Sequence, residues 1–296
     1  MDLPVTIIGG YLGAGKTTLV NHLLRHNDGL RLAVLVNEFG ELPIDADLIE
    51  AQDGGLMSIS GGCVCCAYGS DMIGALEDIA AMDPRPDHVL LEASGVALPA
   101  SIATTVGLMN GIRSDGVIVL ADAEQIRRTA ANSYLSDTID RQIDQADLLL
   151  LTKADLVSDD VLAQVTGWLT AKAPGTKVLQ VSRGEIPVSA LLGAVPFPQR
   201  HAPSPATGHA RFASVLLTPS AAIDGDALAG ALARDPAVTR AKGFVRTHDG
   251  MALIHVVGQR GTVEPATDKH PIGVICIGLA DELDAEALQA LVSEPV

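Results

Sequence analysis

The segment Gly10-Tyr-Leu-Gly-Ala-Gly-Lys-Thr17 constrains the fold more than any other part of this chain. It matches the pattern GxxxxGK[ST], follows the apolar run VTIIGG and precedes the run TTLVNHLLRH, which has a helical pattern. A phosphate-binding loop needs this order of strand, loop and helix, whereas an ordinary glycine-rich turn with a surface lysine does not. Its backbone N–H groups cradle the phosphates at a helix N-terminus, its lysine reaches the terminal phosphates and its threonine ligates Mg²⁺. The sequence therefore predicts a nucleotide site built from Gly10, Gly13, Ala14, Gly15, Lys16, Thr17 and Thr18.

Short apolar runs alternate with helical patterns from residue 4 to residue 182, which is the arrangement of an α/β fold. Aromatic residues make up 3% of the sequence and hydrophobic residues 48%. The core must therefore be built from Ala, Val, Leu and Ile, a mixture that suits buried parallel strands between helices. We expect a mostly parallel seven-stranded sheet, with strands at VTIIGG, LAVLVN, LMSI, HVLLE, GVIVLAD, DLLLLT and KVLQVS.

A chain of 296 residues is long for a single core and favours two domains. Residues 196–209 contain four prolines among small polar residues and show no hydrophobic periodicity, which predicts a linker. We expect residues 1–195 to form the P-loop domain. Residues 210–296 are expected to form a small C-terminal α+β domain with the order strand, helix, strands, helix.

An acidic residue, Glu92, stands at the carboxyl end of the run HVLLE and is followed by Ala-Ser-Gly95. In a P-loop hydrolase, a carboxylate there can hold a metal-bound water while the glycine amide approaches the terminal phosphate. A glutamate at a strand end is by itself usually a solvated terminus, but its position downstream of the P-loop favours catalysis. We predict Lys16, Thr17 and Glu92 as catalytic residues and Gly95 as a phosphate contact.

The tetrapeptide TKAD at 152–155 follows the run DLLLL and matches the [NT]KxD pattern that reads guanine. A carboxylate at Asp155 can accept hydrogen bonds from N1–H and from the exocyclic amine of guanine, whereas adenine offers no matching pair of donors. The stem of Lys153 would pack across the base. A simple helix N-cap is the alternative interpretation. We predict a GTP site that includes Thr152, Lys153 and Asp155 and is closed by Ser182.

Three of the four cysteines, Cys63, Cys65 and Cys66, lie within four positions of the segment GGCVCC. A disulfide is awkward at this spacing, and a reducing compartment keeps thiols free. Three thiolates can supply soft ligands to one ion but cannot easily surround it, so we expect a metal site that is open or completed by another residue. A buried apolar cluster and a thiol redox pair remain alternatives. Cys276, alone in GVICIG, is expected to be a core residue.

With these motifs in place, the chain resembles the CobW-type metallochaperone GTPases, which are relatives of the urease and hydrogenase maturation GTPases. The resemblance covers essentially the whole chain. It rests on GYLGAGKTT at 10–18, VNEFGE at 36–41, GGCVCC at 61–66, LLEASG at 90–95, DGVIVLADA at 115–123 and TKAD at 152–155. It implies GTP hydrolysis coupled to the handling of a transition metal, Zn²⁺ or Co²⁺, with the CxCC cysteines as ligands. It also implies Mg²⁺ beside the phosphates on Thr17, and Glu41 as a residue that could complete the transition-metal shell.

The chain departs from the family pattern at two places. Many relatives have an acidic residue before the proline that follows the ETSG-like segment, whereas this chain has Leu98 before Pro99. Many relatives also carry a histidine-rich run near the domain junction, whereas His201 and His209 stand alone here. We therefore expect the function of that carboxylate to be lost or replaced, and we expect no histidine metal store.

Three classes of function follow from the motifs and the resemblance. The first is a metal chaperone or insertase that serves a client metalloprotein or a cofactor-synthesis enzyme. The second is a nucleotide-dependent regulatory switch, in which the cysteines hold a structural zinc and no metal is delivered. The third is a P-loop kinase that acts on a small molecule and prefers ATP. A homodimer stays open as an assembly.

The charge balance and the hydropathy pattern limit the partners and the compartment. The 36 acidic residues against 20 basic ones give a net charge of -16, which repels nucleic acid. No apolar run reaches the roughly 18 residues that span a bilayer. We therefore expect a cytoplasmic protein whose partners include neither nucleic acid nor a membrane.

Overall fold

The structure is a computed structural model that describes residues 2–37, 56–59, 69–192, 212–267 and 270–293. The chain divides into two compact units, Met1–Glu185 and Ile186–Val296. This division places the short helix α7 (Val188–Leu192) in the second unit, before the predicted boundary at residue 195. The predicted linker 196–209 lies outside the described residues and stays a prediction.

The first unit is built on one seven-stranded sheet, in which every pairing is parallel. The spatial order is β3-β2-β4-β1-β5-β6-β7. The strands are β1 (Leu3–Gly10), β2 (Leu32–Asn37), β3 (Leu56–Ile59), β4 (His88–Glu92), β5 (Ile112–Asp122), β6 (Leu148–Thr152) and β7 (Lys177–Val181). The α/β class predicted from the alternation of apolar runs and helical patterns is thus confirmed.

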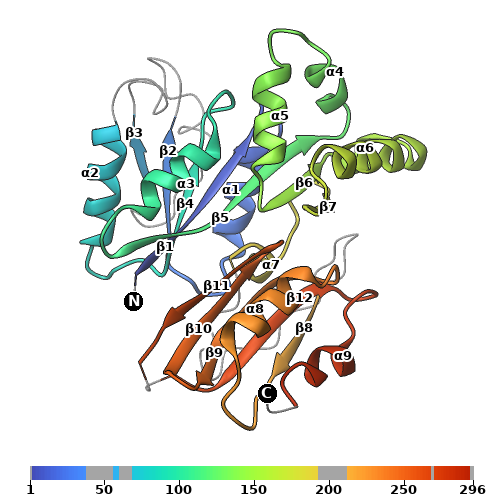
Figure 1. Ribbon diagram of the computed structural model, residues 1–296. Helices are drawn as coiled ribbons and strands as arrows, with labels where there is room; N and C mark the ends of the chain where they lie inside the picture. The colour runs from blue at the N-terminus through green and yellow to red at the C-terminus, as the bar shows by residue number, and fades with distance from the viewer. Residues whose placement is uncertain (1, 38–55, 60–68, 193–211, 268–269, 294–296) are drawn as a thin grey trace. The chain divides into compact units, whose positions relative to one another are not determined.

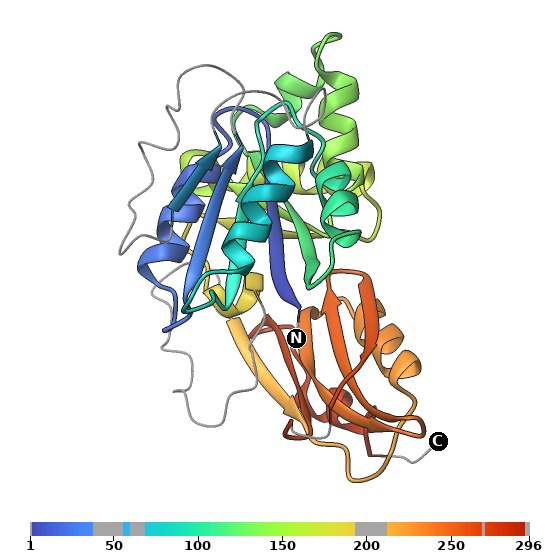
Figure 2. The same cartoon turned by 90° about the vertical axis from the view of Figure 1, so that its left-hand side faces the viewer.

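Helices cover both faces of this sheet, with α1 on the face opposite to α3 (Figures 1 and 2). The helices of the unit are α1 (Lys16–Arg25), α2 (Gly69–Ala80), α3 (Pro99–Gly107), α4 (Ile126–Ala130), α5 (Ser136–Asp144) and α6 (Asp159–Lys172), with a 3-10 turn at Ala154–Leu156. Four of them bury a pair of apolar residues four positions apart, which lie on one face of a helix. These pairs are Met72 and Leu76, Ile102 and Val106, Ile139 and Ile143, and Val165 and Leu169.

The parallel registers bring the predicted site segments to one edge of the sheet, because the carboxyl ends of parallel strands meet there. β1 lies between β4 and β5, with Ile8 opposite Glu92 and Gly10 opposite Leu120. β5 in turn pairs with β6, with Asp122 opposite Thr152. The P-loop after β1, the glutamate at the end of β4 and the TKAD segment at the end of β6 therefore share this edge.

The second unit contains a five-stranded sheet in the order β11-β10-β9-β12-β8, whose strand pairings are antiparallel. Its elements are β8 (Phe212–Leu217), α8 (Gly225–Arg234), β9 (Val238–Thr247), β10 (Gly250–Val257), β11 (Arg260–Pro265), β12 (Gly273–Leu279) and α9 (Ala285–Ala290). Leu228 and Leu232 of α8 share a core with Ile254 and Cys276. The α+β character expected of this part of the chain is therefore present. None of the helices in the described ranges is both long and apolar enough to span a bilayer.

Candidate functional site

The P-loop between β1 and α1 adopts a conformation that its glycines make possible. Gly10, Gly13 and Gly15 have φ values of 128°, 75° and 93°, a region that residues with a side chain rarely occupy. A Cβ on Gly10 would lie 2.4 Å from the Leu120 carbonyl oxygen, so the loop can leave the sheet here only with glycine. Gly15 is the N-cap residue of α1, and the loop therefore ends at a helix N-terminus, where backbone N–H groups suit an anion.

The ammonium group of Lys16 lies inside this loop. Its Nζ donates hydrogen bonds to the carbonyl oxygens of Gly10, at 3.0 Å, and of Tyr11, at 3.5 Å. The side chain is buried. The loop thus curls around a positive charge, which is the arrangement that a phosphate-binding loop requires.

Thr17 and Glu92 meet at the start of α1. The Thr17 hydroxyl donates to Glu92 Oε1 at 3.2 Å, and Glu92 is 2% exposed at the end of β4. A hydroxyl and a carboxylate are the hard oxygen ligands that Mg²⁺ prefers, so the chemistry of these two residues fits the ion predicted there.

The loop between β4 and α3, residues 93–98, lies against the P-loop. The Ala93 N–H donates to the Ile8 carbonyl at 2.8 Å and so extends the pairing of β4 with β1. A Cβ added to Gly95 would lie 2.7 to 2.8 Å from atoms of Leu12, so the two backbones approach closely there. A Cβ added to Gly9 would clash with the ring of Pro99, so Pro99 packs directly on this glycine. The structure therefore brings Gly95 to the P-loop, as the prediction of a phosphate contact requires.

The TKAD segment is joined to the P-loop by its first residue. The Thr152 hydroxyl lies 2.8 Å from the Ala14 carbonyl oxygen and 3.2 Å from that of Ala121, and it can donate to either. Lys153 follows in a left-handed conformation with φ 56°. Its Nζ donates to Asp122 Oδ2 at 2.7 Å. The predicted base-reading segment is thus held against the loop that is predicted to bind the phosphates.

The remaining base-site residues, Asp155 and Ser182, lie on neighbouring loops. The Asp155 carboxylate is 3.9 Å from Nε of Arg183, the residue after Ser182, and about a quarter of its side chain is exposed. A Cβ on Gly184 would be 3.2 Å from the Thr18 carbonyl oxygen, so the loop that carries Ser182 packs on the first turn of α1. The segment with Asp155 therefore lies next to the loop that carries Ser182, and that loop lies next to α1.

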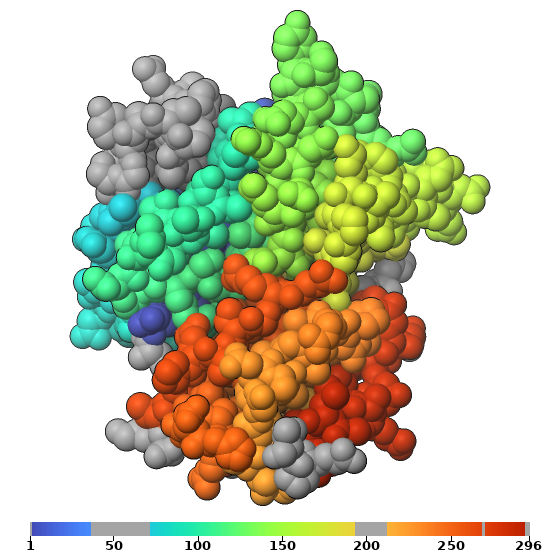
Figure 3. Space-filling model, in the orientation of Figure 1, coloured from blue at the N-terminus to red at the C-terminus, as the bar shows by residue number. Residues whose placement is uncertain are grey.

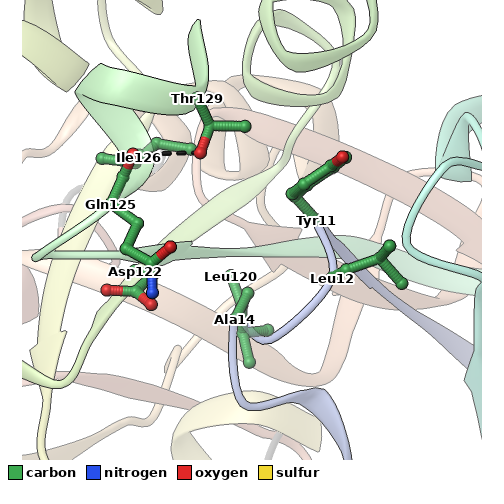
Figure 4. A pocket seen from close by; sticks show the side chains of 8 residues that line it. All are labelled: Tyr11, Leu12, Ala14, Leu120, Asp122, Gln125, Ile126 and Thr129. Carbon is green, nitrogen blue, oxygen red and sulfur yellow. Dashed lines mark hydrogen bonds between the residues drawn. The ribbon is translucent and has the colours of Figure 1, made fainter. Parts of the chain in front are cut away.

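A pocket opens beside the P-loop within the first unit. Figure 4 shows Tyr11 and Leu12 on one side and residues of the α4 region on the other. The lining residues are Tyr11, Leu12, Ala14, Leu120, Asp122, Gln125, Ile126 and Thr129. Asp122 thus borders this pocket while it binds Lys153.

The predicted metal ligands Cys63, Cys65, Cys66 and Glu41 all lie outside the described residues, so their arrangement stays a prediction. Within the described ranges, no group of three or more His, Cys, Asp or Glu residues is placed to hold a metal ion.

Cys276, the remaining cysteine, is fully buried on β12 in the second unit. Burial, with a smaller contribution from the Asp235 carboxylate, raises the pKa of its thiol from 9.0 to about 12. The thiol is therefore protonated at neutral pH and is a poor metal ligand, in line with the prediction of a core residue.

Sequence reasoning missed two residues that hold this site together, Asp122 and Gln142. Asp122 binds Lys153, and the side chain of Gln142 in α5 donates to the carbonyl oxygens of Gly95 and Ala97. The position of Asp122 at a strand end, like that of Glu92, was the signal that could have identified it. Gln142 lies within a helix and carries no comparable signal in the sequence.

Two family models match this chain. One, described as CobW/HypB/UreG, nucleotide-binding domain, matches residues 4–180. The other, described as cobalamin synthesis protein cobW C-terminal domain, matches residues 212–294.

Among curated proteins, the chain is 34% identical over 223 residues to the zinc chaperone CobW of Pseudomonas aeruginosa, with 64% of this chain and 60% of that protein covered. It is 33% identical over 197 residues to zinc-regulated GTPase metalloprotein activator 1 of Schizosaccharomyces pombe, with 62% and 47% covered. The alignments therefore span less than two thirds of these relatives.

A solved structure with a similar fold is that of Zn(II)-bound YjiA GTPase from E. coli. The two chains align over 98% of each with a TM-score of 0.50 and 22% identity. This likeness concerns the fold alone.

Proposed function

This chain belongs to the CobW/HypB/UreG family of nucleotide-binding proteins, and from this membership we propose that it is a GTP-hydrolysing metal chaperone. It binds a transition metal through the CxCC motif at residues 63–66 and delivers the ion to a client metalloprotein or a cofactor-synthesis enzyme. The observation that supports the proposed GTP site is that a P-loop, a buried glutamate and a TKAD segment lie together at one edge of the sheet.

The phosphate end of the site uses charge and backbone dipoles. Lys16, already enclosed by the loop, pairs with the β- and γ-phosphates, and the N-terminal amides of α1 contact the same oxygens. Thr17 would ligate Mg²⁺ and Glu92 would hold a water bound to the ion, and the ion would neutralise charge on the phosphates. Glu92 orients the attacking water through its buried carboxylate, and the Gly95 N–H donates to the γ-phosphate.

The base end of the site selects guanine. Asp155 accepts hydrogen bonds from the N1–H and exocyclic amine of guanine, while Lys153 covers the face of the ring. Ser182 closes the pocket from the loop that packs on α1. Adenine leaves the Asp155 carboxylate without donors, so GTP is preferred.

The transition metal is cargo and not a resident cofactor. Cys63, Cys65 and Cys66 supply thiolates, and Glu41 completes the shell. Zn²⁺ is the first choice and Co²⁺ the second, because thiolates bind both ions and several relatives are named zinc chaperones or zinc-regulated activators. A reducing compartment keeps thiols free, so the cytoplasm is the compartment that goes with this proposal.

The test combines nucleotide turnover with metal content. The wild-type protein should hydrolyse GTP in preference to ATP, and Lys16→Ala should abolish hydrolysis without changing the circular dichroism spectrum. It should bind about one Zn²⁺ or Co²⁺ per chain, and changing both Cys65 and Cys66 to Ser should remove the ion. Equal turnover of ATP and GTP would contradict the GTPase assignment. Full metal content in the double variant would contradict the CxCC site.

A further inference from the structure

The side chain of Gln142 is buried at the junction of α5 with the β4–α3 loop. The residue is 1% exposed although its side chain is an uncharged polar amide. Its Nε2 donates to the Gly95 carbonyl oxygen at 3.1 Å and to the Ala97 carbonyl oxygen at 2.7 Å. An amide NH₂ group has two donors, so both are used on this one loop.

The loop that receives these hydrogen bonds is a tight turn. The Ala97 N–H donates to the Ser94 carbonyl at 2.9 Å, which closes the turn around Gly95 and Val96. The Ala93 N–H anchors the start of the loop on β1, and Pro99 anchors its end on Gly9. Gln142 adds an anchor in the middle, at the residue that approaches the P-loop.

The hydrogen bond from Gln142 matters because residue 95 is a glycine. A glycine has the widest φ/ψ freedom, so its N–H can point in many directions unless the adjoining peptide is held. The Gly95 N–H belongs to the peptide that joins Ser94 to Gly95, and the carbonyl oxygen of this peptide accepts the hydrogen bond from the Ala97 N–H. Because Gln142 binds the carbonyl oxygens of Gly95 and Ala97, it holds the turn that sets the direction of the Gly95 amide.

The helix that carries Gln142 also leads to the base-reading segment. α5 ends at Asp144, and β6, which begins at Leu148, ends at Thr152. The Asp147 carboxylate accepts a hydrogen bond from the Val117 N–H at 2.8 Å and fixes the connection between them to β5. In the space-filling view, α5 and α3 lie side by side on the surface of the first unit (Figure 3). Gln142 therefore joins the β4–α3 loop to a helix that is followed in the chain by the base-reading strand.

We propose that Gln142 is a positioning residue for recognition of the γ-phosphate. It holds the Gly95 N–H in the orientation that contacts the terminal phosphate, and so it favours GTP over GDP without touching either nucleotide. This inference rests on the proposed role of Gly95 in the GTPase site. A purely structural role would instead affect both nucleotides alike.

The test is Gln142→Met, which keeps the length of the side chain and removes both donors. Affinities for GDP and for a non-hydrolysable GTP analogue are measured by isothermal titration calorimetry with Mg²⁺ present. Gln145→Met is the matched control, because Gln145 is the exposed C-cap residue of the same helix.

We expect Gln142→Met to lose about tenfold in affinity for the GTP analogue, the effect of roughly one or two buried hydrogen bonds. Affinity for GDP should change less than about twofold on the same reasoning, and Gln145→Met should match the wild-type protein for both nucleotides. Equal losses for GDP and the analogue, or no loss for either, would overturn the proposal.

A variant that fails to fold would not end the test. Gln142→Asn keeps the amide but shortens the side chain by one methylene. The affinities of this variant for GDP and for the GTP analogue are then compared, and only a selective loss for the analogue supports the proposal. A wild-type protein that bound ATP and GTP equally would instead contradict the proposed function, and this outcome is seen before any variant is compared.

Discussion

The ion pair between Lys153 and Asp122 offers a direct test of how the base-reading segment is held. The Lys153 Nζ lies 2.7 Å from Asp122 Oδ2, and the side chains are 32% and 9% exposed. Asp122 Oδ1 accepts a separate hydrogen bond from the Glu124 N–H at 2.8 Å. Asp122→Asn can keep this second bond and places an NH₂ group opposite the ammonium. The change therefore removes the charge pairing with little effect on the local backbone.

The expected size follows from the burial of the two partners. A hydrogen bond between charged groups contributes about 1.5 to 3 kcal/mol. Solvent reaches about a third of Lys153, which screens the interaction, so the lower end of roughly 1.5 kcal/mol applies. Without the pair, Lys153 must be ordered when the nucleotide binds. We therefore expect Asp122→Asn to weaken GTP binding by up to about tenfold.

The assay is competition with a fluorescent guanine nucleotide, followed by measurement of the GTP-to-ATP affinity ratio. The ratio should stay as in the wild type, because Lys153 contacts the face of either purine whereas Asp155 distinguishes their edges. Asp140→Asn is the control, since it removes an exposed ion pair in which Lys172 Nζ lies 2.9 Å from the carboxylate. Unchanged GTP affinity in Asp122→Asn, or a loss of the same size in Asp140→Asn, would refute this reasoning.

The remaining predictions concern specificity and stability. Asp155→Asn should weaken the binding of GTP and strengthen the binding of xanthosine triphosphate, which nucleotide competition measures. If the variant still prefers GTP, Asp155 does not read the base. Leu98 is the N-cap residue of α3 and makes no side-chain cap hydrogen bond. The Leu98→Asp variant should therefore be about 1 kcal/mol more stable than the Leu98→Ala variant in urea unfolding. Equal stabilities of the two variants would show that a carboxylate at this position does not cap α3. The raised pKa of Cys276 means that the folded state favours the protonated thiol. Its stabilising effect is complete below the unfolded pKa of 9.0 and is lost as pH rises toward about 12. Cys276→Ala should therefore lose less stability than the wild type between these pH values, and identical losses would contradict the shift.

Much of the nucleotide domain could be predicted because its signals are local in sequence. The strand β6, LLLLT, is a continuous apolar run that reads as buried from sequence alone, and all five residues are buried. The P-loop and TKAD segments each combine a strand end with a specific residue pattern, and the parallel sheet then brings the two together.

The features that sequence reasoning missed depend on tertiary contacts or on weak local patterns. Gln142 lies 47 residues from Gly95 along the chain, and no periodicity links a glutamine inside a helix to a distant carbonyl. Strand β11, RGTVEP, contains glycine, proline and two charged residues, lies at the sheet edge and has no fully buried residue. Its pairing with β10 forms it, because its own residues have a low strand propensity.

The structure shows what the replacement of the family's acidic residue by Leu98 changes at the start of α3. An acidic residue at this position would stand at the N-cap of α3, where a side-chain oxygen can accept a hydrogen bond from a backbone N–H. Leu98 cannot do so. Capping of α3 is thus one role that this chain lacks relative to the family pattern.

The central claim, that nucleotide state controls metal handling, is tested most directly by metal affinity in two nucleotide states. In sequence, the CxCC segment lies between VNEFGE, which begins at the end of β2, and Glu92. A γ-phosphate that contacts these two flanking segments should therefore change the coordination of the ion. Zn²⁺ is titrated against a chromophoric chelator into protein that holds GDP or a non-hydrolysable GTP analogue. We predict affinities that differ by roughly 5- to 150-fold, the range of typical coupling free energies, with a smaller difference in Glu41→Gln. Equal Zn²⁺ affinities in the two states would contradict delivery and favour a regulatory switch with a structural zinc.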